Sequence, residues 1–85
     1  MSKSRELSEK YETIRKTVRS NIETIRTLVA QADNLTSLIE ETPDEALRDR
    51  LKDSVKNLYS TIDTLIDESN KLFDQYLDFA NSVAD

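Results

Sequence analysis

The sequence contains no cysteine, histidine, glycine or tryptophan, and only one proline. Without cysteine there can be no disulfide, no thiolate chemistry and no cysteine-bound structural zinc. Without histidine the usual general base near neutral pH is missing, so an enzyme would depend on paired carboxylates, lysine or serine in a concave pocket. The lack of glycine removes phosphate-cradling loops. We therefore expect a protein that is not an enzyme and has no catalytic residue, no metal and no cofactor.

Long apolar runs are also absent. No stretch of about 18 apolar residues occurs, so the sequence predicts no transmembrane helix and no membrane partner. Residues 1–6 lead directly into a charged amphipathic pattern, without the apolar region of a signal peptide. We expect a cytoplasmic protein, although secretion without a signal peptide would leave no trace of this kind.

The residues that are present fit one small helical domain spanning 1–85. Of the 85 residues, 36% are apolar and 34% are charged, and the apolar ones recur at regular spacing, which is not the composition of a disordered chain. A domain of this size has a marginal hydrophobic core unless a partner adds buried area.

The segment Thr42-Pro43-Asp44-Glu45 lies at the midpoint of the chain. Thr42 can cap a helix N-terminus, Pro43 suits the first helical position, and Glu45 can complete a capping box. Proline also disfavours helical angles in the residue before it, so the preceding helix should end near Glu40 or Glu41. The sequence thus predicts two helices, at about 4–41 and 43–84, joined by a sharp corner.

Apolar residues recur at alternating spacings of four and three in both halves, which indicates a heptad repeat with positions a and d in the core. Asp33-Asn34 is a pair of poor helix formers, but we expect the first helix to continue through it. In the first half, d is Leu7, Ile14, Asn21, Leu28 and Leu35, and a is Tyr11, Val18, Ile25, Ala32 and Ile39. In the second half, d is Leu51, Leu58, Leu65, Leu72 and Phe79, and a is Val55, Ile62, Ser69, Tyr76 and Val83.

Two antiparallel helices with this repeat form an all-α hairpin, in which the corner restricts the register. If the reversal is centred between Glu41 and Thr42, Asn21 faces Ile62, and Ser69 faces Ile14. A polar residue in such a core often fixes register, and we assign that role to Asn21. The same register would bring the basic start of the first helix beside acidic residues of the second. Those pairs would join Lys10, Arg15 and Arg19 to Asp63, Asp67, Glu68 and Asp74.

The apolar stripe is wider than one partner helix needs. Position e, next to the core on one side, adds five large apolar residues, whereas the g side is mostly polar; Leu38 and Leu47, near the corner, are expected to pack on each other. A second copy would cover this side, giving a homodimeric four-helix bundle, and a helix of another protein could fill the same place. The predicted partner-binding residues are Ile22, Val29, Tyr59, Ile66 and Phe73.

Charge is distributed unevenly. Residues 1–26 carry seven basic and four acidic side chains, whereas residues 27–85 carry five basic and thirteen acidic ones. The basic residues are interleaved with glutamates, which disfavours nucleic acid as a partner. A row of aspartates at 63, 67, 74 and 78 could imitate nucleic-acid phosphates, but a solvated helix face is the simpler interpretation. Aromatic residues near the open end (Tyr11, Phe73, Tyr76 and Phe79) fit core packing better than a ligand pocket.

In architecture the chain resembles two groups of proteins. Its size and its Pro43-Asp44 corner are similar to those of type III secretion needle subunits and their small helical chaperones. Its helix–corner–helix plan is similar to that of secreted WXG100 proteins, whose Trp-x-Gly corner this chain lacks. These likenesses assign no family.

The sequence favours an acidic, helical protein that acts by binding itself and another protein, as a small regulator, adaptor, assembly chaperone or antagonist. Two alternatives stay open: an acidic mimic that inhibits a nucleic-acid-binding protein, and a structural subunit or chaperone of a secretion or filament assembly.

Overall fold

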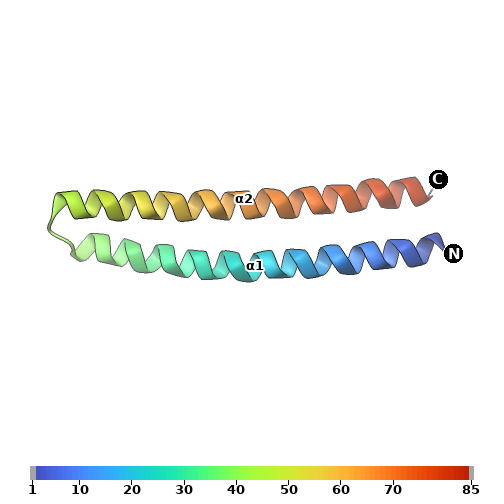
Figure 1. Cartoon of the computed structure of the whole chain (residues 1–85), viewed down its shortest axis with the longest axis horizontal. Helices are drawn as coiled ribbons and strands as arrows, with labels where there is room; N and C mark the ends of the chain where they lie inside the picture. The colour runs from blue at the N-terminus through green and yellow to red at the C-terminus, as the bar shows by residue number, and fades with distance from the viewer. Residues whose placement is uncertain (1, 85) are drawn as a thin grey trace.

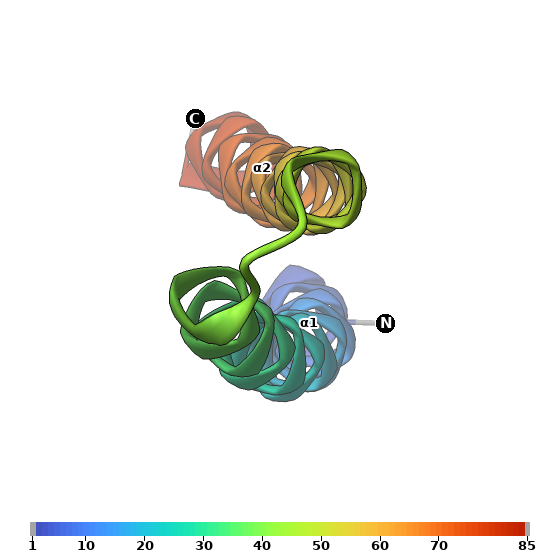
Figure 2. The same cartoon turned by 90° about the vertical axis from the view of Figure 1, so that its left-hand side faces the viewer.

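The computed structural model describes residues 2–84, which form two long helices. Helix α1 runs over Lys3–Glu41 and helix α2 over Glu45–Ala84. The two lie side by side and antiparallel, with both termini at one end and the corner at the other (Figures 1 and 2). The rod measures 64 × 16 × 12 Å. The predicted all-α antiparallel hairpin is confirmed.

Helix α1 is continuous over 39 residues, including Asp33 and Asn34. The prediction that it would not break there is confirmed. Both side chains point to solvent, while the neighbouring Ala32 is completely buried, so the helix gains packing at this level without burying a poor helix former. At the start of the helix the Ser2 hydroxyl accepts a hydrogen bond from the Arg5 backbone N–H at 3.3 Å.

The corner divides the capping roles differently from the prediction. Thr42 closes α1: its hydroxyl donates to the Leu38 carbonyl at 2.6 Å, and its backbone N–H donates to the Ile39 carbonyl. Its backbone is extended, at φ −93° and ψ 116°, as the proline that follows requires. The end of α1 at Glu41 is therefore as predicted, but the assignment of Thr42 as the N-cap of the second helix is wrong.

Asp44 caps α2 instead. Its Oδ1 accepts hydrogen bonds from the backbone N–H groups of Ala46 at 3.0 Å and Leu47 at 3.4 Å. Helix α2 therefore begins at Glu45, two residues later than predicted, and Pro43 lies in the connection rather than at the first helical position. Glu45 occupies the first turn, where its charge favours the helix dipole, but it is not the third residue of a capping box.

Burial along the chain follows the heptad repeat. Between residues 3 and 83, the side chains that are buried or half-buried stand at positions a and d, except for Arg15 and Ala80 at position e. At the corner, Thr42 and Arg48 are also half-buried, and they stand at the next d position of α1 and the preceding a position of α2 in the same repeat. Tyr11 is the one a residue that remains exposed, at 45%. The sequence thus identified the seam between the two helices correctly.

The register of the helices differs from the prediction by one heptad. The Asn21 side-chain amide donates to the Ser69 hydroxyl at 3.2 Å, so Asn21 lies opposite Ser69 and not opposite Ile62. The Tyr11 and Tyr76 rings also meet, with centroids 5.6 Å apart. One heptad corresponds to about 10.5 Å along a helix.

The cause of this difference is the three-residue connection. The prediction started the second helix directly at Pro43, whereas residues 42–44 are not helical and move the reversal toward the C-terminus. The observed register places the two polar core residues, Asn21 and Ser69, in one layer. Ile14 then lies level with Tyr76, and Leu28 with Ile62. The predicted register would have set each polar group against an isoleucine, which is costly for a buried polar group.

The rod has only a thin core. Among residues 2–83, the buried side chains are Ala32 and Ile62, at 0% and 6% exposure. The exposed surface is 6512 Å², whereas a compact 9.8 kDa protein would expose about 5,200 Å². The radius of gyration is 19.2 Å against about 12 Å for a compact domain of this length. The hairpin therefore leaves much of its apolar surface uncovered.

Candidate interaction surface

The five predicted partner-binding side chains, here called the apolar flank, are all partly exposed. Ile22 is 43% exposed, Val29 37%, Tyr59 48%, Ile66 43% and Phe73 47%. These values are high for aliphatic and aromatic residues, which tend to be buried. Five such side chains in a small rod make a surface that needs an explanation.

The antiparallel arrangement brings the flank together from two helices. Position e follows position d directly, so each helix turns its e residues to one side of the seam. Because the helices run in opposite directions, the e rows of α1 and α2 fall on the same side. Ile22 and Phe73 accordingly line one groove of about 690 Å³. Whether this surface binds a partner remains a prediction.

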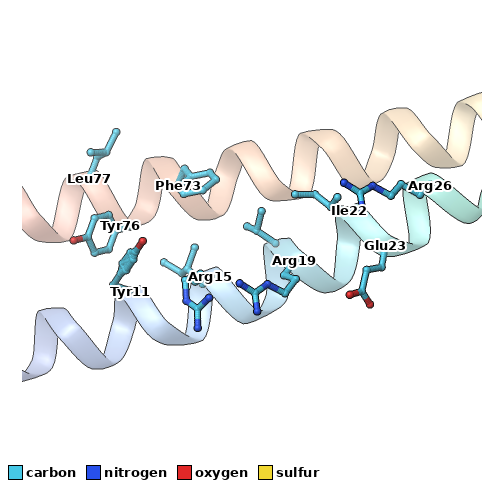
Figure 3. A pocket seen from close by; sticks show the side chains of 11 residues that line it. Tyr11, Arg15, Arg19, Ile22, Glu23, Arg26, Phe73, Tyr76 and Leu77 are labelled. Carbon is cyan, nitrogen blue, oxygen red and sulfur yellow. The ribbon is translucent and has the colours of Figure 1, made fainter.

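The groove lies toward the open end of the hairpin (Figure 3). Core residues Ile14, Val18 and Tyr76 form part of its lining, and Leu77 adds an apolar side chain that is 54% exposed. The sequence analysis did not include Leu77, which stands at position b, further from the seam than e. Its place beside Phe73 on the same face of the helix is the signal that could have identified it.

Basic side chains border this groove on the α1 side. Arg15, Arg19 and Arg26 all line it, with Glu23 among them. Arg15 and Arg19 extend from the edge of α1 away from α2 (Figure 3). The groove is thus apolar along its floor and positively charged along one edge, an arrangement that suits an amphipathic helix with an acidic border.

Arg15 is held by its own helix. Its Nε and Nη2 donate to the two carboxylate oxygens of Glu12 at 3.1 and 3.2 Å. This hydrogen bond lowers the pKa of the Glu12 carboxyl, with smaller contributions from the charges of Arg15, Lys16 and Arg19, and it raises the pKa of Arg15. The guanidinium is thus directed to a carboxylate of its own helix.

The Asn21–Ser69 layer is a satisfied polar pair within the seam. Both residues are half-buried. The Ser69 hydroxyl accepts from Asn21 and itself donates to the Leu65 carbonyl at 3.0 Å. A neighbouring register would separate the two side chains and leave them facing apolar residues, so this layer favours the observed alignment over its neighbours. The register-setting role of Asn21 stays a prediction, and the structure gives its side chain a hydrogen-bond partner, Ser69, that sequence reasoning placed elsewhere.

The aromatic residues near the open end divide between core and surface. Tyr11 and Tyr76 meet edge to face, with ring planes at 74°, and the Lys10 ammonium lies 4.7 Å from the centroid of Phe79. Tyr76 and Phe79 are half-buried in the seam, whereas Tyr11 and Phe73 are exposed. Tyr11, Phe73 and Tyr76 therefore line the groove at its outer end, whereas Phe79 and Lys10 line a separate hollow.

Ion pairs do not join the two helices. Within residues 2–84 the ion pairs are Arg5–Glu9, at 3.6 Å, and Arg15–Glu12, both inside α1. The predicted pairs between the basic start of α1 and the acidic residues of α2 are therefore wrong for this chain in isolation. The three aspartates of these pairs stand at positions b and f, which point away from the seam. Lys10 and Glu68 are both at position g, but in the observed register they lie twelve residues apart in height. The aspartates at 63, 67, 74 and 78 are all exposed.

The opposite side of the rod is polar. A shallower groove of about 540 Å³ there is lined mostly by amides and hydroxyls. Near the corner, Leu38 and Leu47 are 48% and 45% exposed. The two sides of the hairpin thus differ in chemistry: within residues 2–84, five large apolar side chains are exposed along the flank, whereas the exposed leucines of the opposite side lie near the corner. The lining residues on the polar side are Gln31, Asn34, Leu35, Ser54, Asn57, Leu58 and Thr61.

Neither helix, within the part of the chain that the structure describes, holds a stretch long and apolar enough to cross a membrane. Among the same residues, no three acidic side chains converge as they would around a metal ion. Compared with known protein families, characterised proteins and solved structures, the chain shows no match.

Proposed function

We propose that this chain is a non-enzymatic protein–protein interaction module that homodimerises through its apolar flank into a four-helix bundle. The observation that supports this proposal is the flank itself: five large apolar side chains on one side, each 37–48% exposed. The opposite side is mostly polar, with Leu38 and Leu47 exposed near the corner, so the flank is the larger apolar surface for a second copy to cover. A closed two-fold pair is the simplest assembly that covers it.

The energetics make dimerisation and folding interdependent. Complete burial of an aliphatic or aromatic side chain gives roughly 1.5–3 kcal/mol, so covering a side chain that is about half exposed gives roughly 1 kcal/mol. Ten such side chains in a dimer give on the order of 10 kcal/mol, which is similar to the estimated cost of association of about 4–15 kcal/mol. The flank therefore offsets that cost only if nearly all of it is buried.

The dimer would act by binding another protein, as a regulator, adaptor, assembly chaperone or antagonist. Two features support binding rather than catalysis. The groove of about 690 Å³ is lined mainly by apolar and arginine side chains, and the sequence has neither histidine nor cysteine to serve as base or nucleophile.

Light scattering tests the dimer directly. We expect twice the 9.8 kDa chain mass at micromolar concentration, and a stable monomer there would refute the proposal. Ile66→Glu should give a monomer. Asp78→Lys alters charge away from the flank and should leave the dimer intact.

A second candidate function is mimicry of nucleic acid. Its support is the aspartate row on α2, where Asp63, Asp67, Asp74 and Asp78 are exposed and, within residues 2–84, form no ion pair. A mimic would occupy the basic groove of a nucleic-acid-binding protein. If charge reversal at Asp63, Asp67 and Asp74 left partner capture from the native host unchanged, mimicry would be refuted. A filament or secretion subunit would instead show open-ended association in the light-scattering experiment.

A further inference from the structure

We infer that the second copy is related to the first by a two-fold axis running along the rod, so that both corners lie at the same end and α1 packs against the partner's α2. This inference rests on the proposed homodimer and specifies its geometry. Two arrangements can cover the same flank: an axis along the rod, and an axis across it. They differ in which helices become neighbours, and the charges beside the flank distinguish them.

The relevant charges stand at position b, which lies next to e on the side away from the seam. Near the middle of the rod, beside the flank, Arg26 and Asp33 occupy it on α1, and Lys56 and Asp63 occupy it on α2. All four are exposed, and none forms an ion pair within residues 2–84. When a third and fourth helix pack on the flank, the b residues become the border of the new interface.

The Asn21–Ser69 hydrogen bond fixes the heights of these residues along the rod. Arg26 lies five residues toward the corner from Asn21, and Asp63 lies six residues toward the corner from Ser69. Their heights therefore differ by one residue, or about 1.5 Å. Asp33 lies twelve residues toward the corner from Asn21, and Lys56 lies thirteen residues toward the corner from Ser69. The heights of Asp33 and Lys56 therefore also differ by one residue.

Rotation about the long axis keeps every height and sets α1 beside the second copy's α2. Arg26 of each copy then lies level with Asp63 of the other, and Asp33 lies level with Lys56. Both contacts join opposite charges, and the symmetry forms each of them twice. Nearer the corner, Glu40 and Asp49 also stand at position b and match in height, and these two repel. Two attractive matches therefore stand against one repulsive match. These matches are absent within one hairpin, because there the b residues of the two helices point away from each other.

An axis across the rod gives the opposite result. It sets α1 beside α1 and α2 beside α2, so Arg19 and Arg26 would gather with their own copies along one edge. Asp63 would approach its own copy along the other. Like charges placed this way repel and disfavour the arrangement. Since the apolar flank lies near the middle of the rod, either axis would bury it, and charge is the feature that selects between them.

Spin labels at the corner test the geometry. The chain has no cysteine, so Glu45→Cys introduces one labelling site, on an exposed residue at the corner. With the axis along the rod, the two labels should lie within about 30 Å, given helices packed 8–10 Å apart. With the axis across the rod, they should lie near the rod length of 64 Å.

The outcomes separate this inference from the proposed function. A dimer mass with a short label distance supports both. A dimer mass with a distance near the rod length overturns the axis along the rod and leaves the homodimer standing. A monomer mass overturns both. The distance is to be measured by double electron–electron resonance at a concentration where light scattering gives the dimer.

A charge swap tests the pairing itself. Arg26→Asp should weaken the dimer about tenfold, since it turns two border attractions into repulsions. Asp63→Arg should do the same, and the double variant should restore the wild-type dissociation constant. Lys16→Asp makes the same charge change on the outer face of α1 and should have no effect. A double variant that is weaker than either single one would overturn the Arg26–Asp63 contact.

Discussion

Ile66→Glu is the sharpest test of the apolar flank. Ile66 stands in the middle of α2, is 43% exposed in the single hairpin, and loses that exposure when a second copy covers the flank. A glutamate at this position can remain solvated in a monomer but not in the dimer. The substitution therefore acts on association far more than on the hairpin itself.

The size of the effect follows from two terms. Losing the covered part of the isoleucine removes roughly 1 kcal/mol per copy. Placing a carboxylate without a partner in the interface costs at least about 1–3 kcal/mol more per copy. Two copies per dimer give about 4–8 kcal/mol, and since 1.4 kcal/mol is tenfold, the dissociation constant should rise by about a thousandfold or more.

The assay is sedimentation equilibrium or light scattering over a concentration series, with circular dichroism on the same samples. Thr61→Glu is the matched control, because it introduces the same charge on α2, about 7.5 Å away along the helix, but on the polar side. Ile66→Glu should be monomeric and less helical at low concentration, whereas Thr61→Glu should associate and fold as the wild type does. Equal dissociation constants for Ile66→Glu and wild type would refute the role of the flank.

Three further predictions concern the hairpin. Asp44→Ala removes the cap of α2 and should lower the free energy of unfolding by about 1 kcal/mol in urea titrations, and an unchanged midpoint would contradict the capping role. Replacing Asn21 and Ser69 together by leucine should raise stability by roughly 1–3 kcal/mol while releasing the register, visible as duplicated amide resonances; a single set of resonances would contradict the register role. The lowered pKa of Glu12 means that its pair with Arg15 contributes above the carboxyl's ordinary pKa, about 4.3, and is lost as the pH falls through the lowered value. Glu12→Gln should therefore be slightly less helical than wild type at pH 7 and match it in strong acid, and a constant difference across the titration would argue against the pair.

Much of this fold could be predicted because its determinants are local and periodic. The seam follows from the spacing of apolar residues in each half, and the end of α1 follows from the effect of Pro43 on the residue before it. The exposed flank follows from the same repeat, because position e can be identified without knowing which residues face each other.

The capping roles at the corner were not predictable in the same way. Thr42 and Asp44 are both good N-cap residues by type: Thr42 could cap a helix that begins at Pro43, and Asp44 one that begins at Glu45. The choice depends on where the chain must leave α1 to reach α2. In the structure Thr42 serves the end of α1, and Asp44 is left to start α2.

By itself, then, the sequence determined the two helices, their seam and the side that stays apolar, since each depends on residues a few positions apart. Only the tertiary structure decided the register. The three-residue connection permits neighbouring alignments, and the observed one is held by a hydrogen bond between Asn21 and Ser69, which lie 48 residues apart in the chain. That alignment sets the height of every charge on α1 against those on α2, and with it the geometry in which a second copy can bind.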